Sequence, residues 1–118
     1  MKYVIYLIIL LTTYNTTLSN IESDTLKLVT MPDDTLKCNL YYKVSKELNE
    51  FDTEKGLEFG KKGLELSLEL NYTKGLANAY EAIGVNFWRM GIYDAALENH
   101  FQAISIYEKL KDEEHLSK

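Results

Sequence analysis

The chain has 118 residues, a formal net charge of −5 and 46% apolar residues, which allows one small folded domain. The negative charge argues against nucleic acid as a partner, because phosphates call for basic patches. One proline and six glycines leave few breakers, so the composition predicts long helices with short connections. The single cysteine, Cys38, excludes a disulfide within the chain and is expected as a small buried side chain.

The first 19 residues have the layout of a secretory signal peptide. Lys2 carries a positive charge, residues 4–11 form an apolar run, and a polar stretch extends from Thr12 to Asn20. The apolar run is about half the length that a membrane-spanning helix needs. We therefore expect cleavage near Ser19 and export to the periplasm or the medium. An uncleaved membrane anchor and a buried first helix are the alternatives.

Residues 20–33 are expected as a polar lead-in, and four helices are predicted after it. Asp34 and Asp52 are suited to cap the first two helices, and Thr73 the third. Asn71 and Gly91 suit the left-handed residue that ends a helix. The predicted helices are Thr35–Asn49, Thr53–Leu70, Thr73–Met90 and Tyr93–Lys111.

The third predicted helix has one apolar stripe, formed by Leu76, Tyr80, Ile83 and Phe87 at spacings of four, three and four. Gly84 lies beside the stripe, where a missing side chain allows a neighbouring helix to approach closely. The fourth helix has a similar stripe that includes Tyr107. Helices with a single apolar face must pair to be stable, so a packed array is expected.

The chain also repeats itself at a shift of forty residues. Leu57 then matches Leu97, Leu64 matches Ile104, and Leu70 matches Leu110. A fixed period of helix pairs indicates a stacked array. The first helices of the two units match less well, so the first unit is degenerate.

The segment from Tyr80 to Leu97 closely resembles a tetratricopeptide repeat (TPR). Tyr80 stands at the family's Trp, and Ile83-Gly84 stands at its Leu-Gly. Two features depart from the pattern, because His100 replaces an aromatic residue and no proline closes the second helix. The resemblance implies an all-α, right-handed solenoid of antiparallel helix pairs with about two repeats. It divides the chain into a degenerate first pair (34–71), a second pair (72–111) and the start of a truncated third repeat (112–118).

The export signal followed by a weak and an extended repeat looks similar to the N-terminal region of Bacteroidetes-type sensor histidine kinases and related regulators. In those proteins the repeats form the extracytoplasmic input domain. The resemblance implies a protein or peptide partner, and a membrane contact only through an uncleaved signal or a missing C-terminal part. The alternative is a free-standing periplasmic or secreted structural adaptor that self-associates through its exposed last helix.

The expected binding surface is the side of the third helix opposite its core stripe. In the family this side lines a concave groove that holds peptides, and Trp88 beside Arg89 is a pairing enriched at binding hot spots. The alternative is that Val85 and Trp88 pack against the neighbouring unit. The expected groove residues are Asn78, Glu81, Val85, Trp88 and Arg89, with Tyr41, Ser45 and Leu48 from the first unit.

The sequence offers few candidates for catalysis, and neither an enzyme nor a cofactor is expected. The sequence has no Gly-rich phosphate loop, nucleophile elbow or paired CxxC motif. His100 falls on an apolar stripe and is expected to pack in the core. A metal site at His115 beside Glu113 and Glu114 is the remaining alternative, although no second histidine lies at helical ligand spacing.

Overall fold

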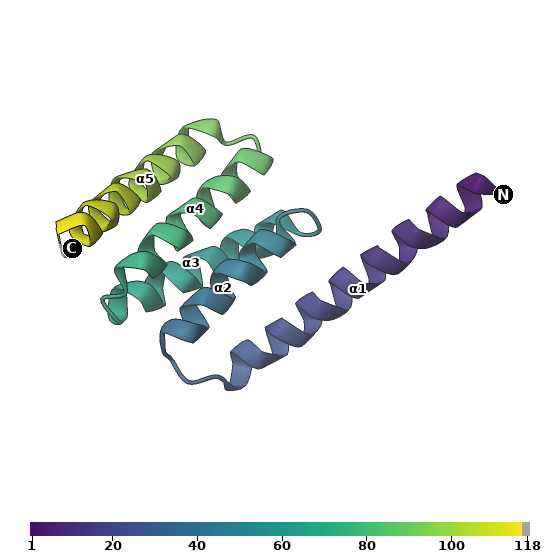
Figure 1. Cartoon of the computed structure of the whole chain (residues 1–118), viewed down its shortest axis with the longest axis horizontal. Helices are drawn as coiled ribbons and strands as arrows, with labels where there is room; N and C mark the ends of the chain where they lie inside the picture. Colours follow the sequence, from purple (N-terminus) through teal and green to yellow (C-terminus); the bar gives the residue numbers. More distant parts are fainter. Residues whose placement is uncertain (117–118) are drawn as a thin grey trace.

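The computed structural model describes residues 1–116, with side-chain surroundings as far as Glu114, and this part of the chain is helical without any strand (Figure 1). The all-α prediction is confirmed. The last four helices begin where predicted, and α5 continues five residues further because no breaker precedes Leu116. The helices are α1 (Lys2–Thr30), α2 (Thr35–Leu48), α3 (Thr53–Glu69), α4 (Thr73–Arg89) and α5 (Tyr93–Leu116).

Consecutive helices pack on one another, and α2 also contacts α4. Figure 1 shows α2 to α5 gathered side by side, while α1 leaves the group and carries the N-terminus far from it. Within the described residues, α5 contacts α4 and no other helix. One side of α4 is therefore covered by α2 and α3, and another by α5.

The starts of α2 and α3 are set by aspartate caps. The Lys37 N–H donates to Asp34 Oδ1 and the Lys55 N–H donates to Asp52 Oδ1, both at 3.1 Å, as predicted. The prediction of a Thr73 cap is wrong. Tyr72 occupies that position without a side-chain cap, so Thr73 is already the first residue of the helix.

Both later turns pass through a left-handed residue, as predicted. Asn71 has φ 53° and Gly91 has φ 77°. The Tyr72 N–H donates to the Ser67 carbonyl at 2.9 Å, and the equivalent bond after Gly91 is also 2.9 Å. This bond from the second residue past the helix end is the Schellman pattern. It lets α4 and α5 follow their predecessors with short connections.

Small residues bring the helices close together. A Cβ added to Gly84 would lie 3.0 Å from the His100 ring, so α5 approaches α4 at this glycine, as expected. The His100 side chain is half-buried in this contact. Cys38 is buried, as its sequence context indicated. The α4–α5 interface is built from small side chains, with Ala96 and Ala103 buried on α5.

A buried polar network joins α2, α3 and α4. The Ser45 hydroxyl donates to the Gly56 carbonyl at 2.6 Å, and Asn86 Nδ2 donates to Ser45 Oγ at 3.1 Å. Asn86 Nδ2 also donates to the carbonyl of Ala82. Polar groups without such partners would be costly in this position, so the network fixes how the three helices fit together.

Residues 20–30, expected as a polar lead-in, are helical. They continue α1, and Ile21 and Leu28 are buried in one cluster with Val44 and Leu48. Ile21 and Leu28 are seven residues apart, so they share one face of the helix and supply an apolar stripe for packing. This end of α1 is therefore part of the folded unit.

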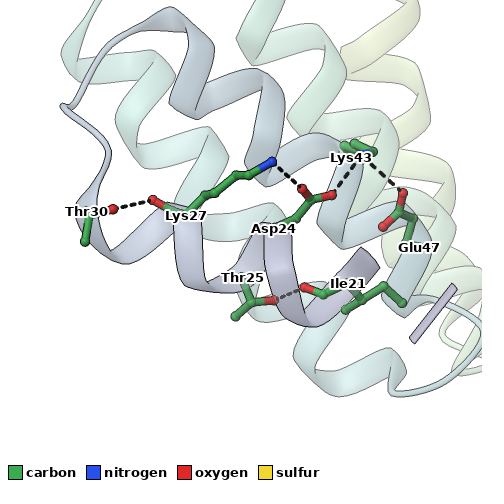
Figure 2. Close-up of polar contacts among 7 residues, drawn as sticks. All are labelled: Ile21, Asp24, Thr25, Lys27, Thr30, Lys43 and Glu47. Atoms are coloured by element: carbon green, nitrogen blue, oxygen red, sulfur yellow. Dashed lines mark hydrogen bonds and ion pairs between the residues drawn. The ribbon is translucent and has the colours of Figure 1, made fainter. Parts of the chain in front are cut away.

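Asp24 lies on the same face and is held by lysines (Figure 2). Its carboxylate accepts from Lys43 Nζ at 2.8 Å and lies 3.5 Å from Lys27 Nζ. Lys43 also lies 3.8 Å from Glu47. The hydrogen bond from Lys43 lowers the pKa of Asp24, so a negative charge is stable in this nearly buried position.

The first half of α1 is exposed. Within the described residues, α1 is the helix long and apolar enough to cross a membrane, with a mean hydropathy of 1.3 over 18 residues and 6% of that window buried. Both a signal sequence and an anchor meet this criterion. A buried first helix does not fit, because the side chains of residues 4–11 are exposed.

Candidate binding face on helices α2, α4 and α5

The five groove residues predicted on α4 share one side of that helix. At 100° per residue they span about 100° of its circumference. Asn78, Glu81 and Val85 are half-buried at the edges of α2 and α5, while Trp88 and Arg89 are exposed. The opposite side of α4 is buried, including Ile83 of the predicted core stripe, so this side is the part of α4 open to a partner.

Glu81 is the centre of the face. Its Oε2 accepts from the Tyr42 hydroxyl at 3.0 Å and lies 3.1 Å from the Tyr107 hydroxyl. Lys46 Nζ lies 3.6 Å from Glu81 Oε1 and donates to the Tyr42 oxygen at 3.1 Å. One carboxylate on α4 therefore holds side chains from both α2 and α5.

The two tyrosines act as hydrogen-bond donors. Burial raises the pKa of Tyr107, and the nearby Glu81 carboxylate raises it further. Burial is also the main cause of the raised pKa of Tyr42. Both phenols therefore stay protonated at neutral pH. The Tyr107 hydroxyl also meets Asn78 Oδ1, so its single hydrogen has two acceptors within reach.

Trp88 and Arg89 extend the face towards the end of α4. Trp88 is 63% exposed and its ring meets the edge of Tyr93, with ring centroids 4.8 Å apart. The exposure of Trp88 does not fit the alternative in which it packs against the neighbouring unit. Val85 is half-buried, so part of its side chain does pack within the fold. The Arg89 guanidinium lies 3.8 Å from Glu50, just past the end of α2.

The residues expected from the first unit lie elsewhere. Ser45 is fully buried in the network with Asn86, Leu48 is buried against α1, and Tyr41 packs towards Phe59 on α3 with ring centroids 6.1 Å apart. None of these three side chains joins the face around Glu81, which Tyr42 and Lys46 reach from α2 instead.

The reason is a difference in register. The period of forty describes α3 and α5, which begin at residues 53 and 93, whereas α2 and α4 begin at residues 35 and 73. The starts of α2 and α4 are therefore 38 residues apart, so, relative to the helix starts, a shift of forty assigned the α2 residues of the face two positions too early. The separation of the predicted helix starts was the sequence signal that pointed to later residues of α2.

The described residues do not meet the requirements of a metal site. Among the residues that the structure describes, no three His, Cys, Asp or Glu side chains come together as a metal site would require. The metal alternative at His115 lies outside the described side chains. The face brings together the Glu81 carboxylate, the phenols of Tyr42 and Tyr107 and the Lys46 ammonium group.

Comparisons with models of protein families, with curated proteins and with solved structures found no match to this chain.

Proposed function

We propose that this chain is an exported TPR-type interaction module that binds a protein or peptide across the face of α2, α4 and α5 centred on Glu81. The observation that carries the proposal is the meeting of three helices at this one carboxylate. Side chains already held by hydrogen bonds lose little freedom on binding, which favours affinity. The role as the ligand-sensing input region of a bacterial signalling protein belongs to the same proposal.

The face offers both charges and an aromatic anchor. Lys46 and Arg89 can receive acidic groups of a partner, and Glu81 can accept from its N–H groups. Trp88 adds a large exposed apolar surface beside them. Trp and Arg are the residue types that most often dominate the binding energy of an interface. A peptide of mixed polarity suits this combination better than a purely apolar one.

Export is supported by the first half of α1. The hydroxyls of Thr12, Thr13, Thr16 and Thr17 each donate to a carbonyl three or four residues earlier in the helix. These bonds lower the cost of placing the threonines in lipid, where unpaired polar groups are expensive. The helix therefore suits passage into a membrane. Cleavage after Ser19 would leave the docked residues 20–30 on the folded unit.

A structural adaptor is the second candidate. Leu97 and Phe101 on α5 are exposed, and an apolar helix face of this kind can drive self-association. Helicity and sedimentation that change with protein concentration would favour the adaptor. A monomer at all concentrations would exclude the self-associating adaptor and favour the interaction module.

The proposal is tested by photo-crosslinking in cells that express the chain. A photoreactive phenylalanine replaces Val85 or Trp88 on the face, and Leu68 on α3 serves as an exposed control. We expect discrete adducts from the two face positions and none from the control. In parallel, Trp88→Ala should weaken capture of the same partner with unchanged helicity. Equal adducts at all three positions, or a loss of helicity in the Trp88 variant, would contradict the assignment of the face.

A further inference from the structure

Helix α5 has a second apolar surface that no other part of the described chain covers. We name Tyr93, Leu97, Phe101 and Ile104 the α5 outer strip; their side chains are between 52% and 62% exposed. At 100° per residue they lie about a quarter turn from Ala96 and Ala103, which are buried against α4. Two adjoining apolar faces on one helix indicate two neighbours, of which α4 is one.

The comparison with α3 shows what the strip lacks. Leu57 and Leu64 stand forty residues before Leu97 and Ile104, and both are half-buried because α3 packs between α2 and α4. Helix α5 contacts α4 alone, and its two equivalent residues are exposed. The strip therefore has the apolar residues of a helix surface on which another helix packs, but no helix covers it within the described residues.

Phe101 gives an independent indication. Its counterpart in α3 is Lys61, which stays exposed although α4 packs beside it. The packing of one helix pair on another therefore does not need an apolar side chain at this position. A phenylalanine 62% exposed in place of a lysine points to a further contact beyond the one with α4.

The charges beside the strip select the occupant. Asp94, Glu98, Glu108 and Asp112 follow its edge away from α4 and are exposed. Within the described side chains, none of these four carboxylates is in an ion pair. Residues 93–116 hold six carboxylates and two lysines, so they carry −4 of the chain's net −5. A partner with basic residues at its edge is complementary to this surface.

A second copy of the chain fits less well. A head-to-tail stack would need the outer surface of α2, which Ile21 and Leu28 of α1 already occupy. A two-fold pairing of antiparallel α5 helices would place both acidic edges on the same side of the contact, where they repel. Of these two occupants, a different protein is the more complementary to the surface.

We propose that the α5 outer strip docks a basic amphipathic helix of a partner protein. The apolar side of that helix covers Leu97, Phe101 and Ile104, and its Lys or Arg residues face the carboxylates from Asp94 to Asp112. This contact adjoins the face around Glu81 at the Trp88–Tyr93 ring pair, but it does not use Glu81 itself.

The probe is a synthetic 17-residue peptide that reproduces the apolar spacing of α4, with Leu, Tyr, Ile and Phe at the positions of Leu76, Tyr80, Ile83 and Phe87. One version has lysines at its edge positions and the other has glutamates. Binding to the full chain in nanodiscs of zwitterionic lipid is followed by fluorescence anisotropy. We expect the lysine peptide to bind at least about tenfold more tightly, with the preference shrinking as salt is added.

Variants identify the surface. Phe101→Lys restores the residue type of the first unit and should reduce binding of the lysine peptide by about tenfold. Leu68→Lys, at an equally exposed position on α3, should leave it unchanged. The double variant Asp94→Lys, Glu98→Lys changes only exposed carboxylates, so it keeps the test valid if Phe101→Lys disturbs the fold. It should reverse the preference in favour of the glutamate peptide.

Equal affinity for the two peptides, or no reversal in the charge variant, would overturn the proposal. So would a dimer of the full chain, in analytical ultracentrifugation, that Phe101→Lys converts to a monomer, because the strip would then be an interface between two copies. Face variants such as Glu81→Gln should not change peptide binding, so a failure here is distinguishable from a failure of the proposed function.

Discussion

The docking of residues 20–30 combines the apolar contact of Ile21 and Leu28 with one nearly buried carboxylate, and removing the charge of Asp24 should weaken it. The perturbation is Asp24→Asn, which keeps the shape of the side chain and removes its charge. In the structure Asp24 is 6% exposed and accepts from Lys43 at 2.8 Å, with Lys27 further away at 3.5 Å. The carboxylate is thus the main polar link between α1 and α2.

The size of the effect follows from the surroundings. A hydrogen bond to a charged group contributes about 1.5–3 kcal/mol. The Lys43 side chain is 54% exposed and its ammonium group lies 3.8 Å from Glu47. In the variant, water and Glu47 therefore replace part of the interaction that Lys43 makes with Asp24. We therefore expect the lower end, about 1.5 kcal/mol, for the local opening of residues 20–30. This corresponds to about tenfold faster amide exchange.

Hydrogen exchange followed by mass spectrometry measures this directly on the full chain. Peptides covering residues 20–30 should exchange faster in the variant, while peptides from α3 and α4 should be unchanged. Most of the difference should disappear in a Lys43→Met background, because the partner is already absent. Lys27→Met is the matched control and should have little effect. Unchanged exchange in residues 20–30, or equal acceleration in every helix, would refute the reasoning.

Three further predictions concern pH and two glycines. The pKa of Asp24 in the folded chain lies below its ordinary value of 3.8. The stabilisation of the end of α1 by Asp24 is therefore complete above pH 3.8 and is lost as the pH falls through the folded pKa. The protection of residues 20–30 from amide exchange, measured against pH, should fall in the same range. Gly91→Ala meets open space but keeps φ at 77°, so thermal unfolding should show a loss of about 1 kcal/mol. Gly56→Ala should cost about 2–3 kcal/mol in urea unfolding, because the new Cβ would lie 2.5 Å from Asn86 Oδ1 and 2.9 Å from the Ser45 carbonyl oxygen.

The bounds of α2 to α5 were largely predictable because several helix ends depend on local chemistry. Asp34 and Asp52 cap by contacts three residues along the chain, and Asn71 and Gly91 take the left-handed conformation that their residue types tolerate. Such interactions depend on neighbouring residues alone, so the printed sequence contains them. The starts of all four helices were therefore correct.

The end of α1 was missed because its helix is stabilised from outside. Residues 20–30 are rich in polar side chains, and only Ile21 and Leu28 mark the buried face. Their role becomes visible once Val44, Leu48 and Lys43 of α2 are in place beside them. Tertiary packing decides the structure of such a segment more than its own composition does.

The candidate face could be predicted for α4 and only partly for its neighbours. Asn78 and Glu81 share a side of one helix, which follows from spacing alone. Tyr42 and Tyr107 reach Glu81 from residues 39 positions before and 26 positions after it, and only the relative placement of three helices brings them together. The spacing pattern of α5 alone placed Tyr107 in an apolar stripe. Spacing reports only the direction of the ring, and it does not show that the hydroxyl reaches Glu81 on α4.

The most direct test of the central claim is the intact mass of the species crosslinked through position 85, measured after separating cytoplasm, membrane, periplasm and medium. The account predicts a soluble exported species that begins near Asn20 and carries one discrete partner mass, with no such adduct from position 68. A species that keeps Met1, stays in the cytoplasm and carries no adduct would contradict both export and the binding face.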